Sequence, residues 1–234
     1  MEVIWNAFRD ALGLLLQADQ PTLRVVGLSL IVSGLATVLA ALVGVPLGAI
    51  LAMYRFPGQR LLTMLINTGM GLPPVVVGLG VALLLWRSGP LGRLGILYTP
   101  AAMIIAQWIV AMPLAAGLTA AGIRLLDREL LGALRVDGAT ELQVGWEVLR
   151  VARTQVLVAI AAAFGRAIAE VGASLMVGGN ILNATRILTT AITLETSRGD
   201  FERAIALGII LLLLALLVNS ALSWRTHHEG FALP

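Results

Sequence analysis

The chain has 234 residues, of which 59% are hydrophobic and only 12% are charged. Soluble globular domains carry about a quarter charged residues, so this composition excludes an ordinary soluble domain and predicts an all-α integral membrane protein. The net charge of +3 is small, every basic residue is an arginine, and there are no cysteines. Disulfide and thiolate chemistry are therefore excluded, and the charge gives no reason to expect a nucleic-acid partner.

The first twenty residues are apolar but are interrupted by charged side chains. Ile4, Trp5, Phe8 and Leu12 recur at helical spacing, and the two aromatic rings suit the headgroup region of a membrane. We predict an interfacial amphipathic helix over 1–20. A short additional span is the alternative.

Five long apolar stretches follow, each of the length that a helix needs to cross a bilayer. Asp19 and Asp200 supply start signals for the first and last of these helices. An odd number of spans places the two ends of the chain on opposite sides, but the flanking arginines divide eight against seven, so they do not orient the chain. The predicted transmembrane domain covers 21–225, with spans at about 25–53, 61–86, 99–123, 154–177 and 204–224 and a tail over 226–234.

Two of the spans carry small or helix-breaking residues. Gly44 and Gly48 lie four residues apart in the first span, which predicts close packing against another helix. Pro73 and Pro74 interrupt the second span within the run GMGLPPVVVGLG, so we expect a kinked or discontinuous helix there. Such a break either relieves packing or lines a transport pathway.

Arg166 and Glu170 are charged residues inside the fourth predicted span. A spacing of four residues on a helix lets the two side chains pair on one face, and leaving either unpaired in the bilayer would cost several kcal/mol. We therefore expect an ion pair that points away from lipid. It is either a structural pair or part of a pathway or gate.

The segment 178–200 is polar, rich in threonine and too hydrophilic to face lipid. Hydroxyl groups without fixed charge suit a transient contact with an oxyanion, which must be held weakly enough to leave. The alternative is an ordinary connector whose hydroxyls satisfy backbone groups. The candidate pathway residues of this segment are Asn180, Thr189, Thr190 and Thr193.

Residues 127–153 form the longest polar interruption, and they hold five of the thirteen acidic residues. Ala139, Leu142, Trp146 and Leu149 recur at helical spacing on one face. Thr140, with Gln143 three residues later, forms a capping-box pattern that predicts a helix beginning just after Gly138. A plain loop between spans needs none of these features, so we predict a folded surface element that faces a partner protein.

The motifs of an enzyme are missing from the sequence. There is no Ser/His/Asp set and no glycine-rich phosphate loop. His227 and His228 are neighbours in the tail, which is a poor arrangement for a metal site. We therefore predict no catalytic residue, no metal ligand and no bound cofactor, and any ATP-driven activity would take its energy from a partner.

The stretch 129–153 resembles the EAA loop of type I ABC importer permeases, which reads Glu-Ala-Ala, three residues, Gly and then a short coupling helix. When the two are aligned on Gly138, the triplet falls on residues 132–134, and Glu129 lies one turn earlier. The resemblance implies that this loop contacts an ATPase. The coupling residues it implies are Glu129, Gly132, Ala133, Gly138, Ala139, Thr140, Leu142 and Trp146.

The stretch 166–180 is similar to the sequence that follows this loop in permeases for molybdate, sulfate and tungstate, and 185–200 looks most like the tungstate branch. The resemblance implies a type I ABC importer permease fold and a homodimer in the membrane lipids of a prokaryotic cell, with the N-terminus outside and the C-terminus cytoplasmic. It implies two cytoplasmic ABC ATPase subunits, which hold ATP and Mg, and an extracytoplasmic oxyanion-binding protein.

The expected function is thus import of tungstate or a close tetrahedral oxyanion. The alternatives are a molybdate, sulfate or phosphate permease of the same family and an ATP-independent secondary transporter or channel. A purely structural anchor would explain neither the loop 127–153 nor the polar segment 178–200.

Overall fold

The computed structural model describes residues 13, 19–127, 132 and 134–228, and these residues form helices and connecting loops without a β-strand. The all-α prediction is confirmed. The interfacial helix predicted over 1–20 and residues 229–234 of the predicted tail lie almost wholly outside the described residues. The helices are α2 (Gln20–Met53), α3 (Gln59–Met70), α4 (Pro74–Leu85), the 3₁₀ turn η1 (Gly92–Leu94), α5 (Pro100–Arg124), α7 (Glu141–Val151), α8 (Arg153–Ile168), α9 (Gly172–Gly178), α10 (Leu188–Ser197) and α11 (Phe201–His228).

Both predicted helix starts are confirmed by their hydrogen bonds. The Asp19 carboxylate accepts from the backbone N–H of Thr22 at 3.2 Å, ahead of the 34-residue helix α2. The Asp200 carboxylate accepts from the N–H of Arg203 at 3.1 Å, at the start of α11. At 1.5 Å per residue α2 is about 50 Å long, which exceeds the thickness of the hydrocarbon core.

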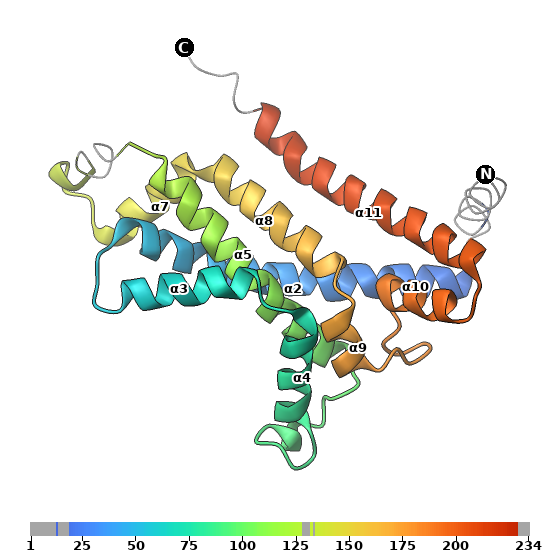
Figure 1. Cartoon of the computed structure of the whole chain (residues 1–234). Coiled ribbons are helices and arrows are strands. Elements are labelled where there is room, and N and C mark those ends of the chain that lie inside the picture. Colours follow the sequence, from blue (N-terminus) through green and yellow to red (C-terminus); the bar gives the residue numbers. More distant parts are fainter. Residues whose placement is uncertain (1–12, 14–18, 128–131, 133, 229–234) are drawn as a thin grey trace.

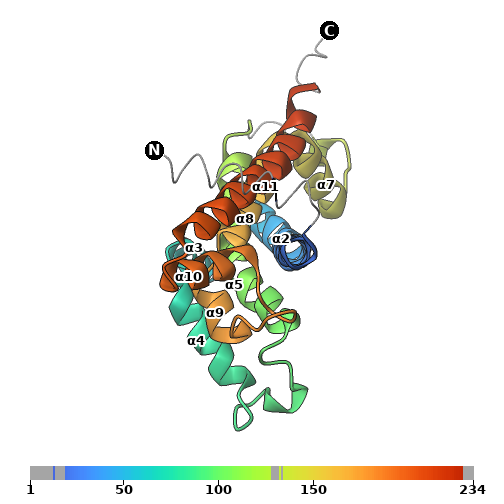
Figure 2. The same cartoon turned by 90° about the vertical axis from the view of Figure 1, so that its right-hand side faces the viewer.

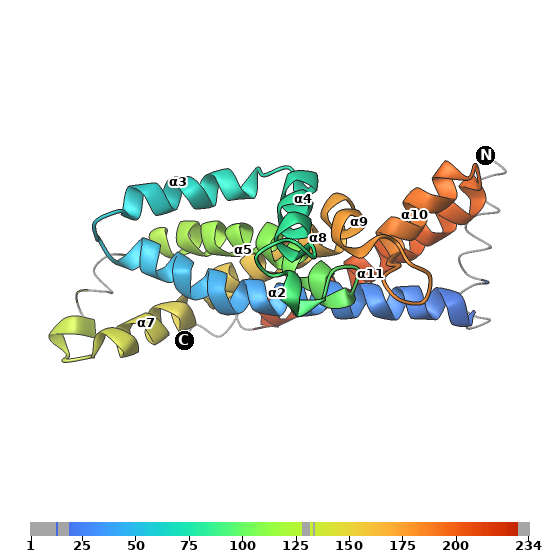
Figure 3. The same cartoon turned by 90° about the horizontal axis from the view of Figure 1, so that it is seen from below.

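Helix α2 runs beside α5 through most of the molecule (Figures 1 and 3). Glycines of α2 permit this approach, because a Cβ at Gly44 would lie 2.9 Å from the Cβ of Ala115, and one at Gly48 would lie 2.9 Å from the Cβ of Thr119. The close packing predicted for the two glycines is confirmed. Alanines continue the contact on α5, and α8 packs against the same region.

The second predicted span is broken, as expected, into α3 and α4, which meet at an angle of 106°. Pro73 is the N-cap residue of α4 and Pro74 its first residue. Neither proline can donate the backbone hydrogen bond that would continue α3. Helix α4 consequently points away from the long axis shared by the other helices (Figures 1 and 2).

The fourth predicted span, 154–177, is also discontinuous. Helix α8 ends at Ile168, and α9 begins at Gly172. In the described part of the chain, three helices are long and apolar enough to cross a membrane by themselves. The number rises to five if two bent pairs, α3 with α4 and α7 with α8, are each counted as one span. Five spans therefore stay a prediction.

The polar elements lie at the two ends of α2. Helix α7 lies near its C-terminal end, whereas α10 and the start of α11 lie near its N-terminal end (Figures 1 and 3). Between them the surface is widely apolar, with Leu35, Leu42, Leu212 and Leu216 among its exposed side chains. Such a surface suits lipid or another membrane helix.

Candidate functional site

The turn before α7 is built by local hydrogen bonds and one glycine. Gly138 has a φ of +82°, a conformation that a residue with a Cβ rarely adopts. The Thr140 hydroxyl accepts from the N–H of Gln143 at 3.4 Å, and the Gln143 side chain accepts from the N–H of Thr140 at 2.8 Å. This capping box and the helix start after Gly138 are both as predicted.

Helix α7 has an anchored face and an exposed face. Val144 and Val148 are fully buried against residues of α2 and α5, among them Ala49 and Ile123. Leu142 and Trp146 are 86% and 71% exposed. The helix is therefore held to the membrane domain by its valines while it presents a large aliphatic and a large aromatic side chain outward.

The apolar face predicted for α7 is exposed to different degrees along its length, although Leu142, Trp146 and Leu149 line one groove. Ala139 and Leu149 pack at the edge of the buried cluster, whereas Leu142 and Trp146 turn away from it. The reason is that a second set of apolar residues, at positions 144, 148 and 152, shares the same helical period and fills the interior. The spacing was visible in the sequence, but it does not say which of two apolar stripes faces inward.

An exposed ion pair closes the turn over the start of α7. The guanidinium of Arg135 lies 2.9 Å from the carboxylate of Glu141 and donates two hydrogen bonds to it. This donation lowers the pKa of the Glu141 carboxyl below its ordinary value. The Tyr54 hydroxyl, just beyond the end of α2, lies 3.4 Å from the Glu141 carbonyl oxygen and donates to it. The turn is thus stabilised by a contact with Tyr54 at the end of α2 as well as by its own ion pair.

A groove of about 760 Å³ separates the end of α2 from the outer side of α7. Its walls are mostly apolar, with Leu142 and Trp146 on one side and Ile50 and Met53 on the other. An exposed apolar groove with a polar rim is typical of a protein-docking surface. This region is our candidate docking site for a partner.

The coupling residues implied by the resemblance gather at this end of the molecule as far as they are described. Gly132 and Gly138 are exposed in the segment before α7. Ala139 and Thr140 begin the helix turn, and Leu142 and Trp146 form its exposed face. Glu129 and Ala133 lie outside the described residues. Contact with an ATPase stays a prediction for the whole set.

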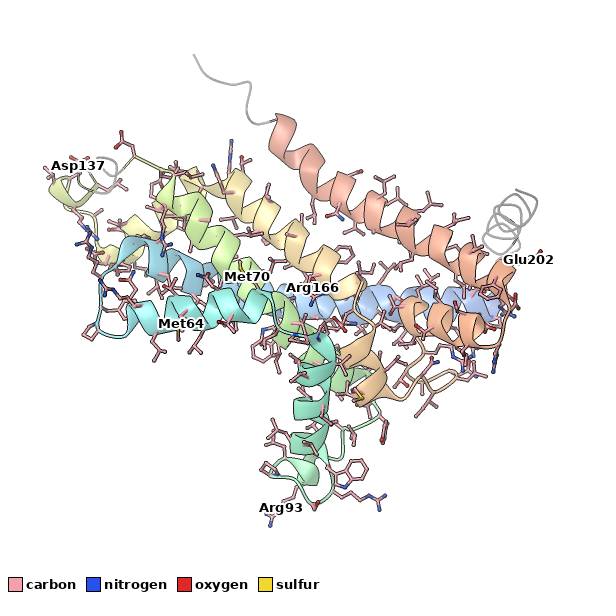
Figure 4. The ribbon with its side chains drawn as sticks, viewed as in Figure 1. Met64, Met70, Arg93, Asp137, Arg166 and Glu202 are labelled. Atoms are coloured by element: carbon pink, nitrogen blue, oxygen red, sulfur yellow. The ribbon has the colours of Figure 1, made fainter. Side chains whose placement is uncertain are left out.

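The predicted ion pair between Arg166 and Glu170 is wrong. Helix α8 ends at Ile168, so the two residues do not share a helical face, and no ion pair joins these two described side chains. The buried Glu170 carboxylate instead accepts from the N–H of Ala173 at 2.9 Å and caps α9. Arg166 lies on α8 near the centre of the molecule (Figure 4).

Asn180 and the threonines of the polar segment are largely engaged in backbone contacts. Thr189 donates to the carbonyl oxygen of Glu170 at 2.9 Å, which joins α10 to the start of α9. Thr190 accepts from the N–H of Ile187 at 3.0 Å. Asn180 donates to the carbonyl oxygen of Thr190 at 3.2 Å. These bonds favour the connector interpretation for Thr189 and Thr190.

Thr193 differs from its neighbours because it is exposed, although its hydroxyl also donates to a backbone carbonyl, that of Thr189, at 3.0 Å. A hydroxyl at the surface retains two lone pairs that accept from other donors. The candidate role of Thr193 in a pathway stays a prediction.

The break in the second span lies close to the same region. Helix α4 packs against α9, because a Cβ at Gly78 would lie 2.9 Å from the Cβ of Met176 and a Cβ at Gly172 would lie 3.3 Å from the nitrogen of Val75. The α4 start at Pro73 and Pro74 and the cap of α9 at Glu170 therefore form one connected group of helix ends. A pathway role for this group is a prediction.

Sequence reasoning missed one buried polar pair beside this group. Gln107 of α5 donates to the Ser174 hydroxyl of α9 at 3.0 Å, and its own carbonyl oxygen finds no hydrogen-bond partner among the described residues. The signal was available, because Gln107 is the one amide in a long uncharged stretch. Among the described residues, no group of three His, Cys, Asp or Glu side chains is placed to hold a metal ion.

These features are those of a multi-helix membrane protein with a docking surface for a partner. A set of apolar helices carries an anchored amphipathic helix at one end, whose outer face suits a partner. Residues 44–224 match the family described as "Binding-protein-dependent transport system inner membrane component". The chain belongs to this family of ABC importer permeases, and its relatives include permeases named for tungstate and anion transport.

Two relatives and one solved structure illustrate the likeness. The chain is 40% identical over 222 residues to "Tungstate uptake system permease protein TupB" of Peptoclostridium acidaminophilum, which covers 95% of this chain and 97% of the relative. It is 44% identical over 201 residues to a "Probable anion ABC transporter permease protein" of Haloferax volcanii, covering 84% and 87%. A bacterial ABC transporter that imports alginate shares the fold, with a TM-score of 0.74, 18% identity and coverage of 94% and 83%.

Proposed function

We propose that this chain is the membrane permease subunit of an ATP-driven importer that translocates tungstate or a close tetrahedral oxyanion. The observation that carries the proposal is the 40% identity, over nearly the whole of both chains, to a permease named for tungstate uptake. The exposed outer face of α7 adds a surface through which a separate ATPase can act.

The proposed complex contains two copies of the chain, two cytoplasmic ABC ATPase subunits that hold ATP and Mg, and an extracytoplasmic binding protein that delivers the anion. Five spans per chain enclose little space by themselves, which supports a pathway between two copies. We assign α7 to the cytoplasmic side, with the N-terminus outside. The permease itself performs no hydrolysis.

The proposed mechanism is alternating access driven through α7. An ATPase subunit that binds Leu142 and Trp146 would displace α7 when it moves. The displacement would reach α2 and α5, because Val144 and Val148 of α7 are packed against both helices. A buried apolar contact transmits displacement well, since packed interiors have low compressibility. The connected helix ends around Pro73, Glu170 and Thr189 are our candidates for the part that opens and closes, with Arg166, Asn180 and Thr193 nearby.

Reconstitution tests this function directly. The permease, its ATPase and its binding protein are placed in liposomes, and ATP hydrolysis and anion uptake are measured with tungstate, molybdate, sulfate and phosphate. We expect tungstate to stimulate hydrolysis at the lowest concentration. Equal or stronger stimulation by another oxyanion would replace tungstate as the cargo, and uptake that is indifferent to ATP would point to a secondary transporter.

A further inference from the structure

A second pocket lies at the end of α2 that is opposite to α7. Its volume is about 410 Å³, within the range of about 300–1,000 Å³ that is usual for small-molecule sites. The walls come from the first turns of α2, the loop before α10, α10 itself and the first turns of α11. Its loop and α10 walls belong to the polar segment 178–200, but none of the described residues singled out for coupling or for the pathway lines it.

Three arginines from three separate elements line this pocket: Arg24 of α2, Arg186 of the loop before α10 and Arg203 of α11. Glu195 is the one acidic residue among the described lining residues, and Arg198 lies 3.5 Å from its carboxylate. No ion pair is formed by Arg24, Arg186 or Arg203 in the described part of the chain. Among the described lining residues, three arginines therefore stand against one glutamate.

The guanidinium of Arg186 is held in place by the loop. It donates to the side-chain oxygen of Asn180 at 3.2 Å and to the backbone oxygen of the same residue at 3.4 Å. Thr185 fixes the loop further by accepting from the N–H of Ile181 at 2.9 Å. A preorganised guanidinium loses less entropy when it binds an anion.

Arg24 and Arg203 lie in unfavourable electrostatic positions. Each belongs to the first turns of its helix, where the helix dipole disfavours a cation. The nearby carboxylates of Asp19 and Asp200 accept from backbone N–H groups of these helices. These carboxylates already face the two helix starts, so an anion between the two arginines would chiefly offset their like charges.

We propose that this pocket binds a tetrahedral oxyanion between Arg24, Arg186 and Arg203. Two sources share this chemistry, the free cargo ion and the phosphate of an anionic lipid. The apolar lining residues, which include Val25, Leu28 and Leu207, suit the chain of a lipid, and the volume suits a hydrated ion. If α7 faces the cytoplasm, the pocket opens on the side from which the cargo arrives. The free-ion case rests on the proposed function.

The first arm of the test measures the free ion. The full-length permease is purified in a neutral detergent, without ATPase or binding protein, and tungstate binding is measured by equilibrium dialysis with elemental analysis. A charged hydrogen bond contributes enough that Arg24→Gln and Arg203→Gln should each weaken binding about tenfold or more. Neither side chain forms an ion pair within the described part of the chain, so we expect both variants to fold.

The second arm measures the lipid. Native mass spectrometry of the same preparations, supplied with phosphatidylglycerol, is expected to show a retained lipid that Arg24→Gln and Arg203→Gln remove. Arg93→Gln is the matched control, because it removes the same charge from the loop beyond α4, far from the pocket (Figure 4). Arg186→Lys, which keeps the charge but loses the Asn180 contacts, should have an intermediate effect.

The two arms separate the outcomes. Tungstate binding lost in the pocket variants supports the free ion, and lipid lost in the same variants supports the headgroup. The proposed anion site is refuted if the wild type binds neither probe. It is also refuted if Arg24→Gln and Arg203→Gln leave binding unchanged. A wild-type complex without oxyanion-stimulated ATP hydrolysis would instead overturn the proposed function, whatever the pocket binds.

Discussion

The buried Glu170 carboxylate stabilises the start of a helix, since it accepts from the N–H of Ala173. Glu170→Ala leaves that N–H without a partner, and we expect a loss of about 1–2 kcal/mol of stability. Glu170→Gln keeps an acceptor oxygen and should retain most of the stability. The check is the thermal unfolding midpoint of the purified variants, and equal losses for Ala and Gln would show that the charge, and not the cap, matters.

Gly48 sets the approach of α2 to α5. A Cβ there would overlap the carbonyl of Ala116 and lie 2.9 Å from the Cβ of Thr119, so Gly48→Ala should cost about 1–3 kcal/mol. Gly34 is on the same helix but has nothing within 4 Å of a built Cβ. Gly34→Ala should therefore be neutral or stabilising by up to about 1 kcal/mol. Thermal unfolding of both variants compares them, and a similar midpoint shift would contradict the packing explanation.

The stabilisation contributed by the Arg135–Glu141 ion pair is expected to depend on pH. The folded-state pKa of Glu141 is lowered, so the stabilisation from this pair is fully present above the unfolded pKa of about 4.3 and is lost as the pH falls through the folded pKa. We expect Arg135→Gln to raise the pKa of Glu141 toward its ordinary value. A carboxyl NMR titration, assigned with Glu141→Gln, measures it, and an unchanged pKa would refute the assignment to Arg135.

At the scale of elements, α7 separates anchoring from docking. Val144→Asp places an unpaired charge in the buried cluster and should cost about 3–5 kcal/mol. Leu142 and Trp146 lie on the exposed face. Leu142→Asp and Trp146→Asp should therefore leave the permease folded but abolish stimulation of the ATPase. Leu94→Asp, also at an exposed leucine but beyond α4, is the control. Full stimulation with Leu142→Asp and Trp146→Asp would remove this face from the mechanism.

The elements that were predictable from sequence are those with local causes. Asp19 and Thr140 cap helices through neighbours three residues away, and Pro73 with Pro74 breaks a helix by missing N–H groups. The break after Ile168 was missed because no proline marks it; it is stabilised by Glu170 and Thr189, whose contact joins residues 19 apart. The pocket of Arg24, Arg186 and Arg203 was missed for the same reason, since nothing in the local sequence brings three distant arginines together.

At the scale of the whole molecule, the two polar ends differ in chemistry. One end carries the helix α7 with exposed apolar side chains, and the other carries a pocket lined by three arginines. Helix α2 joins them and is long enough to cross a bilayer from one to the other. An importer needs such an arrangement, because the energy source and the cargo lie on opposite sides of the membrane.

The orientation can be tested without background, because the chain has no cysteine. Asp137 lies in the turn before α7 (Figure 4), and Asn183 lies in the loop before α10; both are exposed. We expect a membrane-impermeant maleimide to label Asn183→Cys in intact spheroplasts and Asp137→Cys only after permeabilisation, because α7 is assigned to the cytoplasmic side. Labelling in the reverse order would invert the chain, and labelling of both in intact spheroplasts would place the two ends of α2 on one side of the membrane.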